Sequence, residues 1–319
     1  MYINITEYQE TPRGMTLKKG NNMNKKLISL IAGVALVATA TGCSDSATSS
    51  TAGTSSAAGT SASEASSAEA SASATEELSG TLSMNGSTSM EKVIKAVNGA
   101  FMEKNKGVTV NLNLTGSGTG IQEASEGKCD IGNSSRKLKD EEAEKLDATV
   151  IGLDGIALVV NPTNKLEDIT IEDLAKVYSG EITNWKDLGG DDKAIVVIGR
   201  EDGSGTRDGF ESIVMGDKEP KYAQELESTG SVINAVATTD GAIGYASLAN
   251  VDETVKALKV GGVEATEENV KSGAYEVQRP FICATLKGSD NKLAKAYLDF
   301  ILSEEGQALV LAQGAVPVK

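Results

Sequence analysis

Residues 199–210 read Gly199-Arg200-Glu201-Asp202-Gly203-Ser204-Gly205-Thr206-Arg207-Asp208-Gly209-Phe210, and this run marks a passage from strand to helix. The five residues before it are apolar and mostly β-branched, which predicts a buried strand. From Phe210 onward, apolar residues recur at helical spacing. The Gly203–Thr206 turn is therefore expected at a helix N-terminus, where unpaired N–H groups and the positive end of the helix dipole attract anions.

The side chains of this run suit an anion as well. Ser204 and Thr206 offer hydroxyl donors, and Gly205 lets the backbone approach a ligand closely. Arg200 adds a fixed positive charge with a forked set of donors. A purely structural interpretation is also open for this run alone, in which Ser204 caps the helix and Arg200 pairs with Asp202 at the surface.

Composition limits the possible functions. The chain has 319 residues, of which 39% are hydrophobic, enough for two globular lobes. Its formal net charge of −15 argues against a nucleic-acid partner. The sequence contains no histidine, which excludes histidine-based catalytic triads and histidine metal sites. Its three cysteines support neither a disulfide framework nor a cysteine-rich zinc site, although Cys129 and Cys283 could either pair or stay as buried thiols.

The N-terminal region reads as an export signal behind an unexpected extension. Residues 1–22 are polar and precede Met23, which we expect to be the true start. Residues 23–42 combine a basic pair with an apolar stretch too short to span a membrane, as in a signal peptide. Ala40-Thr41-Gly42-Cys43 resembles the lipobox of bacterial lipoproteins, with Ala in place of the usual Leu. We therefore expect Cys43 to be lipidated.

Residues 43–78 are rich in serine, alanine and threonine and poor in large apolar side chains. Such a segment cannot bury enough surface to offset its conformational entropy, so we expect a disordered tether. The root-mean-square end-to-end distance of a flexible chain is about 5–6 Å times the square root of its number of residues, which gives roughly 30 Å for this segment.

Strands and helices alternate from about residue 80, which predicts α/β layers around a largely parallel sheet. We expect strands at 81–84, 108–114, 130–132, 150–160, 194–198 and 281–285, a helical segment at 222–227 and a closing helix at 294–311.

Three of the expected helices begin in the same way. Turns rich in glycine, serine and threonine follow apolar strands at Gly86–Ser89, Gly116–Gly120 and Gly203–Thr206. In open α/β sheets ligands bind at the carboxyl ends of the strands, where these turns lie. One such turn is weak evidence, because serine and threonine caps are common. Three together predict a site for a tetrahedral oxyanion, with Arg200 and Arg136 neutralising its charge.

The order of these motifs resembles the phosphate-binding proteins of ATP-driven (ABC) phosphate importers. The resemblance covers residues 80–319 and includes these segments: Gly86-Ser87-Thr88-Ser89, Thr115–Gly120, Asp130–Arg136, Tyr178–Trp185, Gly199–Thr206 and Gly241–Tyr245. It implies an α/β, two-lobed periplasmic-binding-protein (type II) fold with the ligand in the cleft between lobes. We expect 79–153 and 248–319 to form the first lobe and 154–247 the second.

The resemblance also implies which residues bind phosphate. By motif these are Thr88, Ser89, Ser117, Arg200, Ser204, Gly205 and Thr206. We also expect Ser87, Ser135 and Arg136 to be ligands. Asp202 is expected to orient Arg200 from behind. Trp185 and Tyr245 are assigned to packing rather than to ligand contact.

One departure from the family pattern affects selectivity. Many members carry an aspartate where this chain has Ser135, and that carboxylate accepts the proton of hydrogen phosphate while repelling sulfate. A serine hydroxyl can donate or accept, so it discriminates less. We hypothesise that Asp154 supplies the missing acceptor. The alternative is that Asp154 caps a strand or pairs with a lysine.

The sequence thus predicts a monomeric, extracytoplasmic receptor, lipid-anchored to the outer face of the bacterial cell membrane. It would bind inorganic phosphate by hinge closure and deliver it to an ABC permease, with no catalytic residue, cofactor or metal. One alternative is a receptor for sulfate, molybdate or tungstate. Others are an adhesive lipoprotein and a hydrolase using Ser204 or Ser117, for which the sequence offers no histidine base.

Overall fold

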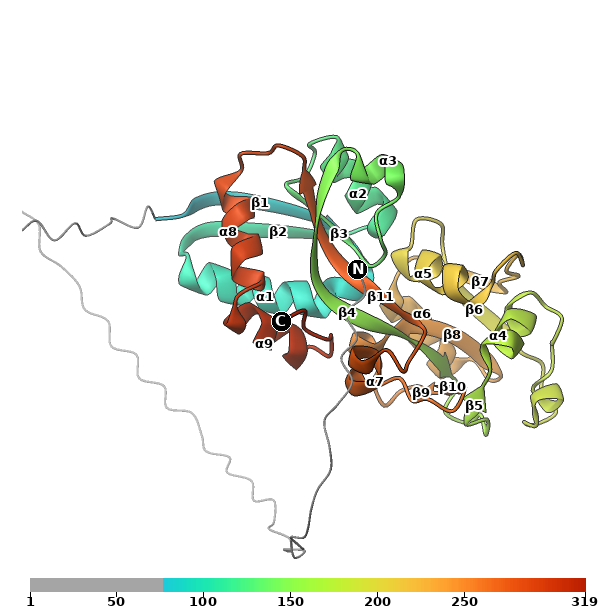
Figure 1. The fold of residues 1–319 in the computed structure, drawn as a ribbon. Helices are drawn as coiled ribbons and strands as arrows, with labels where there is room; N and C mark the ends of the chain where they lie inside the picture. Colours follow the sequence, from blue (N-terminus) through green and yellow to red (C-terminus); the bar gives the residue numbers. More distant parts are fainter. Residues whose placement is uncertain (1–76) are drawn as a thin grey trace, which may run out of the picture. The chain divides into compact units, whose positions relative to one another are not determined.

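The computed structural model describes residues 77–319, which form two lobes joined by a pair of long strands (Figure 1). The predictions for 1–22, for the signal peptide 23–42, for Cys43 and for nearly all of the tether concern residues outside this range. Within residues 77–319, no helix combines the length and the apolar composition that a membrane crossing requires.

The first lobe is built from both ends of the described chain. Its N-terminal elements are β1 (Ser79–Gly86), η1 (Thr88–Met90), α1 (Glu91–Lys104), β2 (Gly107–Leu114), α2 (Ser117–Ser125), β3 (Ile131–Ser134) and α3 (Asp140–Ala143). Its C-terminal elements are β11 (Gln278–Leu286), α8 (Lys292–Ile301) and α9 (Glu304–Ala312). The strand β4 (Leu146–Val160) begins in this lobe and leaves it.

The second lobe lies between these two parts in the sequence. It contains β5 (Asp168–Ile169), α4 (Ile171–Tyr178), η2 (Trp185–Leu188), β6 (Val196–Arg200), α5 (Gly205–Val214), β7 (Gln224–Leu226), α6 (Thr229–Thr238), β8 (Ala242–Ser247), η3 (Leu248–Asn250), β9 (Lys256–Ala257), β10 (Lys259–Val260) and α7 (Glu267–Ser272).

One continuous sheet runs through both lobes in the order β2-β1-β3-β11-β4-β8-β6-β7, with β9 paired to β4. β1 pairs in parallel with β2 and β3, and β6 pairs in parallel with β7 and β8. The two crossing strands, β4 and β11, are antiparallel to each other and to their neighbours β8 and β3. The largely parallel sheet expected from the sequence is therefore right for the outer strands of each lobe and wrong for the crossing pair.

β4 marks the boundary between the lobes. Its first part, Leu146–Gly155, pairs with β11, and its last part, Ile156–Val160, pairs with β8. The return to the first lobe comes later than residue 248, because β9 pairs with the end of β4 and Val270 and Tyr275 belong to the second lobe's core. Residues 256–277 thus pack with the second lobe, which corrects the expected boundary.

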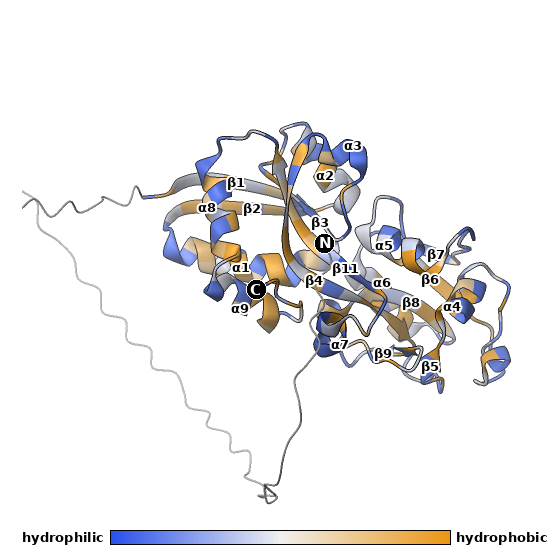
Figure 2. Ribbon diagram, viewed as in Figure 1, coloured by the Kyte–Doolittle hydropathy of each residue, from blue (hydrophilic) through white to orange (hydrophobic). Residues whose placement is uncertain are grey.

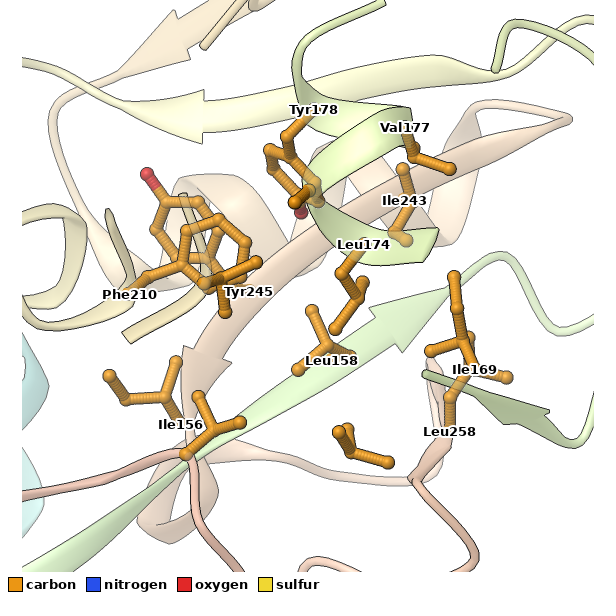
Figure 3. Close-up of a cluster of buried hydrophobic side chains, with 14 of the residues drawn as sticks. Ile156, Leu158, Ile169, Leu174, Val177, Tyr178, Phe210, Ile243, Tyr245 and Leu258 are labelled. Atoms are coloured by element: carbon orange, nitrogen blue, oxygen red, sulfur yellow. The ribbon is translucent and has the colours of Figure 1, made fainter. Parts of the chain in front are cut away.

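Each lobe has its own core. The first packs α1 residues such as Val93, Ile94 and Phe101 against the sheet, with Tyr297 of α8 edge-on to Phe101 at 5.2 Å between ring centroids. The second gathers side chains of β4, α4, α5 and β8, among them Leu158 and Phe210, and is shown in Figure 3. Figure 2 shows apolar residues concentrated on the central strands and polar residues on short outer helices such as α3 and α7.

Trp185 and Tyr245 both pack in the second core, as expected. The indole N–H of Trp185 donates to the Gly241 carbonyl at 2.9 Å, and Tyr245 stacks on Phe210 at 4.3 Å. Cys129 and Cys283 are free, buried thiols, so the pairing left open by the sequence does not form.

Two helix predictions were wrong. Residues 222–227 contain the edge strand β7, paired with β6, rather than a helix. The closing helix expected at 294–311 is divided into α8 and α9, because the Ser303 hydroxyl accepts a hydrogen bond from the Gly306 N–H and starts a new helix.

Candidate functional site

The three glycine-, serine- and threonine-rich turns meet where the two lobes face each other. The Ser89 hydroxyl of the first lobe lies 2.7 Å from the Thr206 hydroxyl of the second. The Gly118 N–H, in the first turn of α2, donates to the Gly203 carbonyl at 2.9 Å. The helix starts that the sequence singled out are therefore brought together across the cleft.

The first lobe contributes a cluster of buried hydroxyls. Ser87 donates to the Ser135 oxygen at 2.8 Å, and the Ser117 oxygen lies 3.3 Å from it. The Ser135 N–H also donates to the Ser117 oxygen at 3.1 Å. All three serines are buried. Because hydroxyls can rotate to donate or accept, such a cluster can adapt to an oxyanion.

The second lobe presents the start of α5. Ser204 is its N-cap and accepts from the Arg207 N–H, while Thr206 is buried in the first turn. Gly205 lies so close to the first lobe that an added Cβ would be 2.3 Å from the Ser117 oxygen and 2.7 Å from the Ser135 oxygen. Only glycine permits this approach, so the residue fits the closed cleft for a steric reason.

Arg200 ends β6 at the base of α5 and is only 2% exposed. Its guanidinium donates to the carbonyls of Leu226 and Glu227 at 2.9 and 2.8 Å, and to the Thr229 hydroxyl at 3.3 Å. Each of these partners is neutral. Desolvation lowers the pKa of Arg200 to about 10, and repulsion from Arg279 adds to the shift.

Thr229 is a site residue that the sequence interpretation missed. It begins α6, a fourth helix start, and its hydroxyl lies 3.2 Å from that of Thr88 and 3.1 Å from that of Ser89. The signal was present, because Ser228-Thr229-Gly230 repeats the same turn chemistry. Because the sequence predicts a helical segment at 222–227 in place of the strand β7, the pattern of strand, turn and helix is not visible there.

Arg279 was also missed, and it forms a buried ion pair with Asp154. Its Nε and Nη2 donate to one Asp154 oxygen at 3.1 and 3.0 Å, and its Nη1 donates to the Ser135 oxygen at 3.1 Å. The other Asp154 oxygen accepts from Ser247 at 2.8 Å. Complete burial raises the pKa of the Asp154 carboxyl, while Arg279 and Ser247 oppose the shift.

These contacts bear on the role expected for Asp154. Both of its oxygens are already engaged, and its partner is an arginine rather than the lysine considered as an alternative. It touches the serine cluster only through Arg279. Its role as acceptor of a ligand proton stays a prediction.

Two other charged residues have unexpected partners. Arg136 pairs with Glu142 of α3 and with Asp208 of α5, rather than with the hydroxyls of the cleft. Asp202 does not brace Arg200: its side chain is 96% exposed and pairs with Arg207 at 3.0 Å. The carbonyls of Leu226 and Glu227 hold Arg200 instead, because β7 and the turn after it lie beside β6.

The arrangement offers an anion many donors and one buried cation without a carboxylate partner among the described residues. Hydroxyls of both lobes and the Arg200 guanidinium converge on one place. A tetrahedral oxyanion can accept hydrogen bonds in four directions, which suits donors supplied from both sides.

A family model, curated relatives and solved structures all relate this chain to the same family of proteins. Residues 44–305 match the model of the PBP superfamily domain. The chain is 36% identical to the phosphate-binding protein PstS of Bacillus subtilis (strain 168) over 236 residues, which cover 72% of this chain and 78% of that protein.

Two solved structures are similar over the same part of the chain. One, from Clostridium perfringens, is assigned as a phosphate ABC transporter substrate-binding protein and contains bound phosphate. It is 41% identical to this chain with a TM-score of 0.71, and the match covers 75% of this chain and 100% of the Clostridium chain. The other, an ABC-type phosphate transport receptor from Vibrio cholerae, is 31% identical, with a TM-score of 0.63, covering 74% of this chain and 99% of that one.

Proposed function

We propose that this chain, which belongs to the PBP superfamily and within it to the PstS phosphate-binding proteins, captures inorganic phosphate between its lobes and passes it to an ABC permease. It acts by binding rather than catalysis, in keeping with relatives named for phosphate binding and transport.

The observation that carries this proposal is that Arg200 is a buried positive charge whose hydrogen-bond partners are all neutral. A buried charge is costly unless it is compensated, and the hydrogen-bond partners of this guanidinium are neutral. An anion bound between the lobes would supply the missing negative charge. Arg200 faces Thr229, which in turn contacts Thr88 and Ser89 of the first lobe, so the anion would contact both lobes at once.

Hinge closure follows from the same geometry. The donors sit on two lobes connected by β4 and β11, and several already meet across the cleft. Bending β4 and β11 where they pass from one lobe to the other would separate the donors of the two lobes and admit the ligand. The ligand set that we propose from the first lobe is Ser87, Thr88, Ser89, Ser117 and Ser135, and from the second Arg200, Ser204, Gly205, Thr206 and Thr229.

Selectivity would depend on Ser135. Its oxygen accepts hydrogen bonds from Ser87 and Arg279, so its own proton can be donated either to the Ser117 oxygen, 3.3 Å away, or to a ligand. In this closed arrangement Asp154 is linked to Ser135 through Arg279. A site lined by donors does not by itself reject an oxyanion without a proton. Sulfate, molybdate and tungstate are therefore the competing ligands to be tested.

We further propose an extracytoplasmic location with a lipid anchor at Cys43. The support is the signal-like segment 23–42 and the lipobox-like residues that end at this cysteine. A receptor tethered to the outer face of the membrane would stay near its permease.

Calorimetric titration of the ligand-stripped protein with phosphate, sulfate, molybdate and tungstate tests the function. We expect one phosphate per chain, and an affinity lost by at least about a hundredfold in Arg200→Met, because a charge-assisted contact to a buried anion is removed. Arg207→Met is the matched control, since Arg207 already pairs with Asp202, Glu211 and Glu225. Tight binding that survives in Arg200→Met, or turnover of a phosphate ester, would contradict the proposal.

A further inference from the structure

We propose that Arg136 is not a ligand of the bound anion but a positioning residue that holds the closed cleft through Asp208. This inference rests on the proposed function, because closure is what retains phosphate. It assigns the second arginine of the sequence motif to a different task from that of Arg200.

Arg136 is fixed within its own lobe. It follows Ser135 in the loop after β3, and its side chain is only 8% exposed. Nη1 and Nη2 donate to the two oxygens of Glu142 at 2.7 and 2.8 Å, and Nη1 also donates to the Lys137 carbonyl at 2.9 Å. Glu142 in turn accepts from the Lys139 N–H at 2.8 Å. The guanidinium is therefore held in place by contacts that do not depend on the second lobe.

Asp208 approaches from the second lobe. It lies in α5, one turn beyond the Ser204–Thr206 start, and its Oδ2 is 2.7 Å from Nε of Arg136, an ion pair that is not aligned as a hydrogen bond. The same helix therefore carries a ligand turn and a contact to the opposite lobe. Any rotation that withdraws Ser204–Thr206 from the serine cluster must also move Asp208 relative to Arg136.

The charge balance separates Arg136 from Arg200. Arg136 faces two carboxylates, whereas the partners of Arg200 are neutral. Glu142 and Asp208 each stabilise the Arg136 charge, so the pKa of this arginine is raised, with the Glu142 hydrogen bonds as the largest cause and burial acting against them. A guanidinium compensated twice has no charge left over to attract an oxyanion.

Preorganisation makes the contact effective. Since Glu142 already orients the guanidinium, closure needs to immobilise only Asp208, and less entropy is lost than in pairing two free side chains. Arg136 is 8% exposed and Asp208 36%, so water screens this pair less than it would screen two fully exposed charges. The pair should therefore slow the opening of the cleft while leaving the open form equally accessible to phosphate.

Release and capture of phosphate by Asp208→Asn test this inference. We expect radiolabelled phosphate to dissociate roughly tenfold faster into excess unlabelled phosphate, as for other close charge pairs across an interface. The association rate should change by less than about twofold, because most effects of interface substitutions fall on dissociation. Asp208→Glu, which keeps the charge, should restore slower release.

Asp202→Asn is the matched control. It removes an equal charge from the same end of α5, but Asp202 pairs with Arg207 in its own lobe. Its release rate should equal that of the wild type. Urea unfolding of each variant shows whether the fold is retained.

A double-mutant cycle with Arg136→Gln distinguishes the two roles of the arginine. If the contact is a closure contact, Asp208→Asn has no further effect in the Arg136→Gln background. If Arg136 binds phosphate, Asp208→Asn frees it and affinity stays the same or rises, which would overturn the inference. Binding by the wild type with unchanged release in Asp208→Asn would overturn only this closure contact, whereas a wild type that binds no phosphate would overturn the proposed function itself.

Discussion

Arg279 and Asp154 face each other on the two strands that connect the lobes, as direct partners in the register of β11 and β4. Two nitrogens of Arg279 donate to a single oxygen of Asp154, and both side chains are buried. An ion pair thus lies at the point where the protein is expected to bend. Its third donor, Nη1, reaches the Ser135 hydroxyl of the ligand cluster.

Asp154→Asn should destabilise the protein strongly. The substitution leaves the buried Arg279 charge without its carboxylate, and removing one partner of a buried ion pair costs about 3–5 kcal/mol. Urea unfolding monitored by circular dichroism measures the loss. Ser247→Ala is the milder comparison, expected to cost about 1–3 kcal/mol because it removes one donor to Asp154. Equal stabilities of Asp154→Asn and the wild type would show that the pair does not stabilise the fold.

Gly205→Ala should weaken phosphate binding while sparing the fold. The added methyl group would collide with the oxygens of Ser117 and Ser135, so the cleft could not close fully. We expect calorimetry to report a loss of about a hundredfold, since each factor of ten corresponds to about 1.4 kcal/mol of lost contact.

Gly99→Ala is the control for that substitution. Gly99 is an exposed position in α1 where an added Cβ meets nothing within 4 Å, so the change should raise stability by about 0.5–1 kcal/mol and leave binding alone. Undiminished affinity in Gly205→Ala would mean that phosphate is held without this close approach of the lobes.

Phosphate affinity should fall at alkaline pH. Desolvation in the closed, ligand-free cleft lowers the pKa of Arg200 to about 10, so in that state this group begins to lose its charge near pH 10. Because phosphate binding is expected to need the positive charge of Arg200, affinity should be steady from about pH 8, where phosphate is almost entirely the dianion, to pH 10, and then drop by about tenfold per unit.

The contribution of Arg200 to the free energy of unfolding changes with pH in the opposite direction to its contribution to binding. Its folded pKa lies below the ordinary arginine value, so its charge weighs against the fold below pH 10 and the penalty is relieved as pH rises. Loss of binding above pH 10 is therefore not unfolding caused by this group. Calorimetry from pH 7 upward, with circular dichroism at each pH, checks both statements, and a pH-independent affinity would remove Arg200 from the site.

Cys43→Ser should release the protein from the membrane. If Cys43 carries the lipid anchor, fractionated cells should show the variant in the soluble or secreted fraction and the wild type with the membranes. Cys129→Ser, which alters a buried thiol of the first lobe, is expected to remain membrane-bound. Membrane association of both variants would exclude Cys43 as the anchor.

Local patterns in the sequence predict most of the hydroxyl residues that the structure brings together between the lobes. Ser89, Ser117 and Thr206 stand in turns whose glycine and hydroxyl residues follow apolar strands, and this signal is contained within about ten residues. The parallel strands of each lobe then bring the turns together without further information. Helix starts are for this reason the part of the site that the sequence predicts best.

Contacts between distant charges could not be obtained in the same way. Asp154 and Arg279 are 125 residues apart and meet only because β4 and β11 cross the lobes side by side. The partners of Arg136 and Asp202 likewise depend on which carboxylate happens to lie within a few ångströms. Residues 256–277 were assigned to the wrong lobe because the short strands β9 and β10 carry almost no pattern of their own.

The position of β11 in the sheet also sets the order in which the protein can assemble. This strand lies between β3 and β4, so the sheet of the first lobe has a gap until residues 278–286 have been synthesised. The second lobe is encoded between the two parts of the first and has all of its strands earlier. During synthesis the lobe that begins the chain is thus the last to be completed, and a ribosome stalled before β11 would carry a first lobe with an open sheet edge, a surface prone to pairing with other chains.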